Sequence, residues 1–85
     1  MKFFDAMKAM EAGEVVRIKG SVSYFVKPTG LVERWSVIFE DGTPSLATGF
    51  FYSNEVESDD WEIVANPPKQ LAERAAAFRK EQKRQ

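Results

Sequence analysis

Short segments of alternating apolar and polar residues, separated by turn residues, fill the middle of this 85-residue chain and constrain its fold most. In residues 14–19 the apolar Val16 and Ile18 share one side of an extended chain. Arg17 and Lys19 fall on the other side. A period of two residues is typical of a strand with one buried face. The predicted strands span residues 14–19, 22–27, 31–40, 45–52 and 61–64.

Turn residues indicate how these strands connect. Gly20-Ser21 and Pro28-Thr29-Gly30 predict tight turns, and Asp41-Gly42 is the strongest short hairpin signal in the chain. Gly49 lies inside the fourth predicted strand, where it indicates a bulge or the close approach of another group. We therefore expect an antiparallel sheet.

An amphipathic helix is predicted at the start of the chain. Phe3, Ala6 and Met10 recur at helical spacing, so they form one apolar stripe. Gly13 follows the stripe and favours the left-handed conformation that ends many helices. A helix this short needs a partner, so its stripe should pack on the sheet.

A second helix is predicted over residues 69–83, after Pro67-Pro68 ends the last strand. Its apolar stripe is thin, which predicts a weak contact at a sheet edge or in an oligomer. The fold class is therefore α+β: a small twisted antiparallel sheet of about five strands, an N-terminal helix on one face and a basic C-terminal helix. Residues 1–66 would form the ligand-binding core and residues 67–85 the basic tail.

The composition excludes several kinds of chemistry. The chain has no cysteine and no histidine, so disulfides, Cys-based zinc sites and nucleophile–histidine pairs are excluded. Residues 53–60 read as a polar, acidic loop without the spacing of a calcium loop, and we expect no metal site and no cofactor there. No apolar run is long enough to span a membrane. We expect a non-enzymatic cytoplasmic protein that binds rather than transforms its partner.

Charge is unevenly distributed along the chain. Residues 1–68 carry six basic and eleven acidic residues, a net charge of −5. Residues 69–85 carry six basic and two acidic residues, a net charge of +4. Such a basic segment is either a solvated helix face or a contact for an anionic partner.

Aromatic residues near the end of the fourth predicted strand suggest a binding site. Phe50 and Tyr52 would stack on a base, and Ser53 and Asn54 would bond a ribose or phosphate. The cations Arg17, Lys19 and Arg34 lie on strands and would meet an anionic ligand. The alternatives are a two-sided core or oligomer interface for the aromatics, and plain surface exposure for the cations.

Several short motifs resemble a family of small bacteriophage proteins. Members open with a Phe–acid–Ala–(Leu/Met) helix, as in Phe3-Phe4-Asp5-Ala6-Met7, followed by a Val-x-Arg strand, here Val15-Val16-Arg17. They close with a Gly-Trp-Leu-Ala-Ser-Gln-like stretch and an Asp-Trp-Glu-Ile strand. Their counterparts here are Gly49-Phe50-Phe51-Tyr52-Ser53-Asn54 and Asp60-Trp61-Glu62-Ile63. The family includes the second-type Thoeris anti-defence proteins, which sequester the cyclic ADP-ribose-type signal of a bacterial immune system.

The resemblance implies a phage-encoded anti-defence protein that assembles as a homo-oligomer and holds a cyclic nucleotide-type signal, cyclic ADP-ribose-like or a cyclic oligonucleotide, without cleaving it. Two other functions remain open. The acidic body could act as a decoy that inhibits a host defence complex, as an anti-CRISPR does. The basic tail could instead make the chain a nucleic-acid-binding accessory protein.

Overall fold

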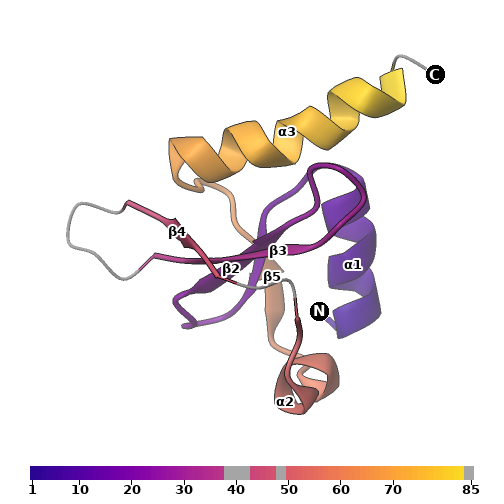
Figure 1. Ribbon diagram of the computed structural model, residues 1–85. Coiled ribbons are helices and arrows are strands. Elements are labelled where there is room, and N and C mark those ends of the chain that lie inside the picture. The colour runs from indigo at the N-terminus through magenta and orange to yellow at the C-terminus, as the bar shows by residue number, and fades with distance from the viewer. Residues whose placement is uncertain (38–42, 48–49, 84–85) are drawn as a thin grey trace.

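The computed structural model describes residues 1–37, 43–47 and 50–83, with side chains described up to residue 77. A five-stranded antiparallel sheet has the order β4-β3-β2-β1-β5, with helices α1 and α3 packed against it (Figure 1). The elements are α1 Phe3–Glu11, β1 Val16–Ile18, β2 Ser23–Val26, β3 Glu33–Ser36, β4 Ser45–Leu46, α2 Ser53–Glu57, β5 Trp61–Ile63 and α3 Lys69–Lys83. The predicted α+β fold class is confirmed.

Helix α1 covers one face of the sheet through its predicted stripe. Ala6 and Met10 are completely buried and pack with Val16, Phe25 and Trp61 from three strands. Gly13 has a φ of 90°, the left-handed conformation that its position after the helix predicted. The chain therefore reverses directly from α1 into β1, because few residues other than glycine adopt this conformation at low cost.

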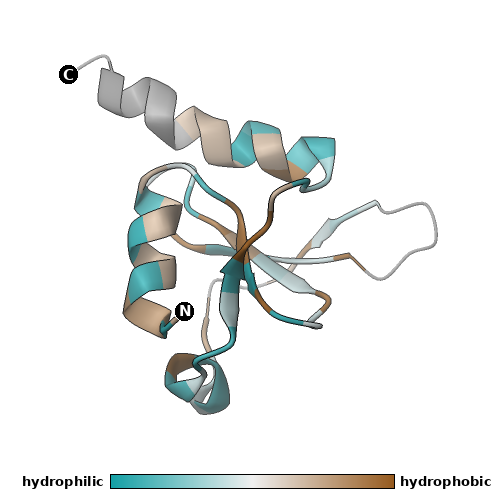
Figure 2. Cartoon of the chain, turned by 180° about the vertical axis from the view of Figure 1, so that it is seen from behind, coloured by the Kyte–Doolittle hydropathy of each residue, from teal (hydrophilic) through white to brown (hydrophobic). Residues whose placement is uncertain are grey.

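Helix α3 covers the opposite face of the sheet. Leu71 and Ala75 are buried there with Val15, Val26 and Trp35. In Figure 2 the hydrophobic segments of the strands lie near the centre of the molecule, below α3 and beside α1. We expected this helix to dock at a sheet edge or in an oligomer; within one chain it packs on the sheet face instead of an edge, because Leu71 and Ala75 meet Val15, Val26 and Trp35 there.

An ion pair also ties α3 to the sheet. The Arg74 guanidinium pairs with the Glu33 carboxylate of β3, and Glu33 also accepts a hydrogen bond from the Trp35 indole at 3.1 Å. Helix α1 and the first half of α3 are therefore part of one packed unit, with a helix on each sheet face.

The turns between the first strands agree with the sequence. The Ser21 amide donates to the Ile18 carbonyl at 2.9 Å, and Gly20 at the third position of this turn has a φ of 84°. Gly30, in the turn after β2, has a φ of 86°. The predicted hairpin at Asp41-Gly42 and the predicted bulge at Gly49 lie outside the described residues.

Three predicted segments need correction or trimming. The strand predicted over residues 31–40 is β3, Glu33–Ser36, and residues 38–40 lie outside the described part of the chain. The return strand predicted over residues 45–52 is only β4, Ser45–Leu46, and Tyr52 instead precedes a helix. The acidic loop predicted over residues 53–60 contains α2. Helix α2 forms there because the Glu55 carboxylate caps it and pairs with Arg34 of β3.

Candidate functional site

A buried ion pair between β3 and α2 organises the predicted binding segment. Arg34 and Glu55 are only 7% and 6% exposed. Arg34 Nη1 donates to Glu55 Oε2 at 3.0 Å, and Arg34 Nη2 pairs with the second carboxylate oxygen. Two parallel bonds between a guanidinium and a carboxylate give both strength and a defined orientation. The positive charge of Arg34 is therefore already engaged within the chain.

Two aromatic rings enclose the Arg34 guanidinium. Its central carbon lies 4.7 Å from the centre of the Phe25 ring and 4.8 Å from the centre of the Tyr52 ring. Arg34 Nη2 also donates to the Phe50 carbonyl at 2.8 Å. Cation–π contacts gain strength where the cation is shielded from water. Arg34 thus anchors the chain on both sides of Phe51.

Glu55 is the second anchor of this segment and explains why α2 forms. Its Oε1 accepts a hydrogen bond from the Tyr52 amide at 2.8 Å, as the glutamate of a capping box does. Its backbone carbonyl accepts from the Trp61 indole at 2.8 Å. Sequence reasoning missed this role because the residue before the helix is Tyr52, so the usual Ser/Thr-x-x-Glu signal is absent.

These anchors hold two aromatic rings on the surface. Phe50 is 77% exposed and Tyr52 is 65% exposed, although the backbone of both residues is tied to the ion pair. Ser53 and Asn54 begin α2 and are also exposed. We call Phe50, Tyr52, Ser53 and Asn54 the aromatic surface. It lies beside α2, at the end of the molecule opposite α3 (Figure 1).

Phe51, between the two exposed rings, is half-buried and joins the aromatic surface to the core. Its ring lies 4.8 Å from the Phe25 ring and 5.0 Å from the Phe3 ring, measured between centroids. Phe4, next to Phe3 on α1, is 75% exposed. Phe51 therefore packs against the core, while its neighbours Phe50 and Tyr52 are exposed to solvent.

Arg17 does not lie with the aromatic surface. It lies opposite Tyr24 of β2 and Glu62 of β5 in the sheet register, on the face that α3 covers, whereas Arg34 lies opposite Phe25 on the α1 face. Arg17 Nε donates to Glu62 at 2.8 Å, and Nη1 donates to the Tyr24 hydroxyl at 3.0 Å. The hydrogen bond to Glu62 raises the pKa of Arg17, and Tyr24 adds to this effect.

Lys19 follows β1 and is exposed, and its amide donates to the Asp60 carbonyl at 2.9 Å. The structure thus brings Arg34 together with Phe50, Tyr52, Ser53 and Asn54, and it places Arg17 on the other face of the sheet. Strand register decides this separation, because it sets which residues of neighbouring strands share a face, and alternation along one strand carries no information about register.

The described residues contain no group of three or more His, Cys, Asp or Glu side chains that could hold a metal ion. Within the same residues no helix is both long and apolar enough to cross a bilayer. Comparisons with protein-family models, curated proteins and solved structures found no match for this chain.

Proposed function

We propose that this protein binds a cyclic nucleotide-type signal at the aromatic surface and holds it without cleaving it. In biological terms, we propose a phage-encoded anti-defence protein that acts in the host cytoplasm. The observation that carries the proposal is the pair of exposed rings, Phe50 and Tyr52, held from beneath by a buried ion pair. Aromatic rings that stay on the surface are typical platforms for nucleobases.

Stacking would supply most of the affinity at this surface. Glu55 neutralises Arg34, so Arg34 adds little net charge for a phosphate. The hydroxyl of Ser53 and the amide of Asn54 are exposed and can bond a ribose or phosphate oxygen. In a homo-oligomer, which is part of this proposal, a second copy would bring its own cations to the ligand.

Calorimetry with cyclic ADP-ribose isomers and cyclic oligonucleotides tests the proposal. We expect one of these ligands to bind at micromolar concentration or below, and Tyr52→Ala to weaken binding about tenfold or more, as loss of one stacked base contact does. Leu31→Ala is the matched control, because Leu31 is 73% exposed and follows the turn at Gly30, away in sequence from the aromatic surface.

Recovery of the unmodified ligand after heat denaturation distinguishes sequestration from hydrolysis. The proposal fails if none of these ligands binds to micromolar protein, or if Tyr52→Ala binds as well as the unchanged chain. Turnover of the ligand would instead show that the protein is an enzyme.

A second function, inhibition of a host defence complex by an acidic decoy, is favoured by a specific observation. Glu57 and Asp59 are exposed just after the aromatic surface, where no described ion pair neutralises them. Rings flanked by negative charge fit a basic protein surface. The double variant Glu57→Gln/Asp59→Asn separates the two functions: it should weaken binding to such a partner and leave or improve binding of an anionic nucleotide.

A further inference from the structure

Arg34 carries a buried hydrogen-bond donor that has no partner. Its Nη1 and Nη2 atoms both bond Glu55, and Nη2 also donates to the Phe50 carbonyl. Its Nε atom is buried as well, but this N–H meets no hydrogen-bond acceptor within the described part of the chain. The Arg34 side chain is only 8% exposed. Folded proteins rarely leave such a donor unpaired, because burial removes the water that would otherwise accept the bond.

Arg17 shows how the same atom is satisfied elsewhere in the sheet. Its Nε atom donates to the Glu62 carboxylate at 2.8 Å. Arg34 instead binds Glu55 with its two outer nitrogens, so its Nε–H points away from that carboxylate. The unpaired donor is therefore a consequence of the way in which Arg34 and Glu55 meet.

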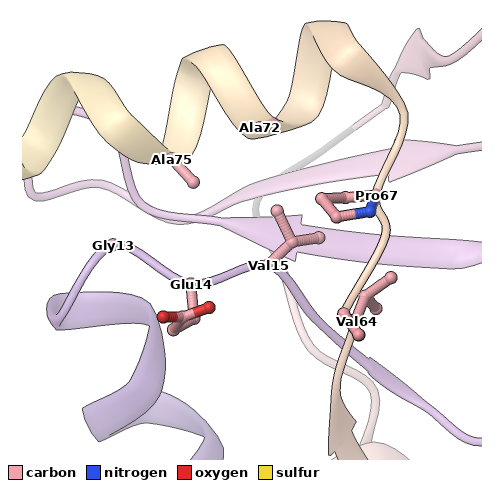
Figure 3. Close-up of a pocket in the computed structure, with 8 residues that line it drawn as sticks. Gly13, Glu14, Val15, Val64, Pro67, Ala72 and Ala75 are labelled. Carbon is pink, nitrogen blue, oxygen red and sulfur yellow. The ribbon is translucent and has the colours of Figure 1, made fainter.

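The pocket beneath α3 contains no comparable group. Figure 3 shows the Glu14 carboxylate on the α1 side of the chain, turned away from Val15 and Ala75. Among the described residues that line this pocket, none carries a charged side chain that points into it. We therefore look for the polar contact of a ligand at Arg34 and not beneath α3.

The surroundings of Arg34 Nε favour a neutral acceptor over an anionic one. Nη2 uses one hydrogen for Glu55, so its 2.8 Å bond to the Phe50 carbonyl lies on the edge of the guanidinium that also carries the Nε–H. A phosphate oxygen at Nε would lie close to this carbonyl oxygen and to the Glu55 carboxylate, and both would repel it. A hydroxyl group can accept the bond from Nε and direct its own proton toward a nearby oxygen.

The aromatic surface provides the route to this donor. The Arg34 guanidinium lies between the rings of Phe25 and Tyr52. Phe25 is only 1% exposed and is fixed in the core, whereas Tyr52 is 65% exposed. A turn of the Tyr52 ring would open the guanidinium from the solvent side, and exposed side chains change rotamer within nanoseconds. A ribose is bonded directly to its base, so a base stacked on Tyr52 brings ribose hydroxyls to this edge of Arg34.

We propose that the Nε–H of Arg34 binds a ribose hydroxyl of the ligand and thereby selects ribonucleotides over their deoxy counterparts. This inference rests on the proposed function in placing the base on Tyr52. It adds the part of the ligand that the chain recognises, which is the nucleoside rather than the phosphate. One hydrogen bond to a charged donor corresponds to about a tenfold difference in affinity.

Titration of the isotope-labelled chain with adenosine and with 2′,3′-dideoxyadenosine, followed by NMR of the arginine Nε–H signals, tests this inference. The probes have the same base and no phosphate, and they differ only in the 2′- and 3′-hydroxyls. We expect adenosine to bind at about millimolar concentration and about tenfold more tightly than dideoxyadenosine. The Arg34 Nε–H signal should shift with adenosine only. The Arg17 Nε–H signal should shift with neither probe, because this atom already donates to Glu62.

Three variants separate stacking from the hydroxyl contact. Arg34→Lys keeps a positive charge beside Glu55 but has no Nε–H, so it should bind both probes equally weakly. Arg17→Lys makes the same change at the other arginine and should keep the tenfold preference. Tyr52→Ala should weaken both probes and leave their ratio unchanged. If Arg34→Lys does not fold, the Nε–H signal of the unchanged chain still decides the question.

The outcomes distinguish this inference from the proposed function. Equal affinity for the two probes, or an Arg34 Nε–H signal that stays constant while adenosine binds, would overturn the inference. Binding of a cyclic nucleotide without binding of adenosine would also overturn it and leave the proposed function standing. Adenosine bound through Arg34 without binding of any cyclic nucleotide would refute the proposed function alone, and no binding of either kind would refute both.

Discussion

Arg17 and Arg34 are both strand arginines, but their guanidinium groups meet different surroundings. The side chains of the Arg34–Glu55 pair are each only 8% exposed, whereas those of the Arg17–Glu62 pair are 29% and 34% exposed. Removing one partner of a buried pair leaves a charge without solvent or counter-ion. A pair in contact with water loses little, because water replaces the lost partner.

Glu55→Gln should therefore lower the free energy of unfolding by about 3 kcal/mol. Glu62→Gln makes the same chemical change in the exposed pair and should cost less than about 1 kcal/mol. Urea denaturation of both variants measures the difference. Equal losses would show that burial does not determine the strength of the Arg34–Glu55 pair.

The charge of Arg17 in the pair with Glu62 should persist at neutral pH and well above it. Its hydrogen bond to Glu62 raises the pKa of Arg17, so the arginine contribution to stability is fully present below the pKa of an unfolded arginine and is lost only in strong alkali.

Residue type and alternation were enough to select the two arginines and the exposed rings Phe50 and Tyr52 as candidate site residues. They did not reveal that Glu55 takes the charge of Arg34, because these residues are 21 positions apart.

At the scale of elements, the turn between β1 and β2 depends on one glycine. Gly20 has a φ of 84°, and a Cβ atom added there would meet no atom within 4 Å. Substitution is therefore opposed by backbone conformation rather than by crowding.

Gly20→Ala should destabilise the fold by about 1 kcal/mol, and Gly20→Asn should cost less because asparagine adopts the left-handed conformation more readily. Thermal unfolding of the two variants gives the comparison. If alanine and asparagine cost the same, side-chain size rather than φ controls this turn.

Local patterns predicted α1 and α3 well because their stripes and stop signals lie within one segment. Helix α2 was missed because five residues with mostly polar side chains carry no clear helical period. The helix forms because Glu55 caps it and accepts a hydrogen bond from Arg34. Arg34 is 21 residues away in the chain, so a pattern over a few neighbouring residues cannot predict this contact.

At the scale of the whole molecule, α3 is part of the core. Its buried residues Leu71 and Ala75 lie in its first half, while Arg79, Lys80, Lys83 and Arg84 follow in residues 78–85. A truncation within α3 can therefore remove the basic residues and keep Leu71 and Ala75.

Deletion of residues 69–85 should destabilise the fold by about 3 kcal/mol or more, because it removes Leu71 and exposes Val26 and Trp35. Deletion of residues 78–85 keeps Leu71, Ala75 and the Arg74–Glu33 pair, so it should cost less stability than the longer deletion. Circular dichroism during heating measures both. If the longer deletion is as stable as the full chain, α3 is only a tail.

The shorter deletion also tests whether the chain binds nucleic acid. If it does, removal of residues 78–85 should abolish the binding while the domain stays folded, and binding by the full chain should weaken steeply as salt rises. Binding that survives the deletion would rule out the basic segment as the contact.

Residue patterns alone were enough to predict the α+β class, the helices α1 and α3, the glycine turns and the aromatic segment, because each depends on residue period or backbone conformation over a few neighbours. The sheet face that each charged residue occupies became clear only from the folded chain. Strand register placed Arg17 on the sheet face that α3 covers and Arg34 on the α1 face, where it pairs with Glu55 of α2. These contacts join residues that are far apart in the chain. They depend on how the strands and helices pack together, and a pattern over a few neighbouring residues does not predict that packing.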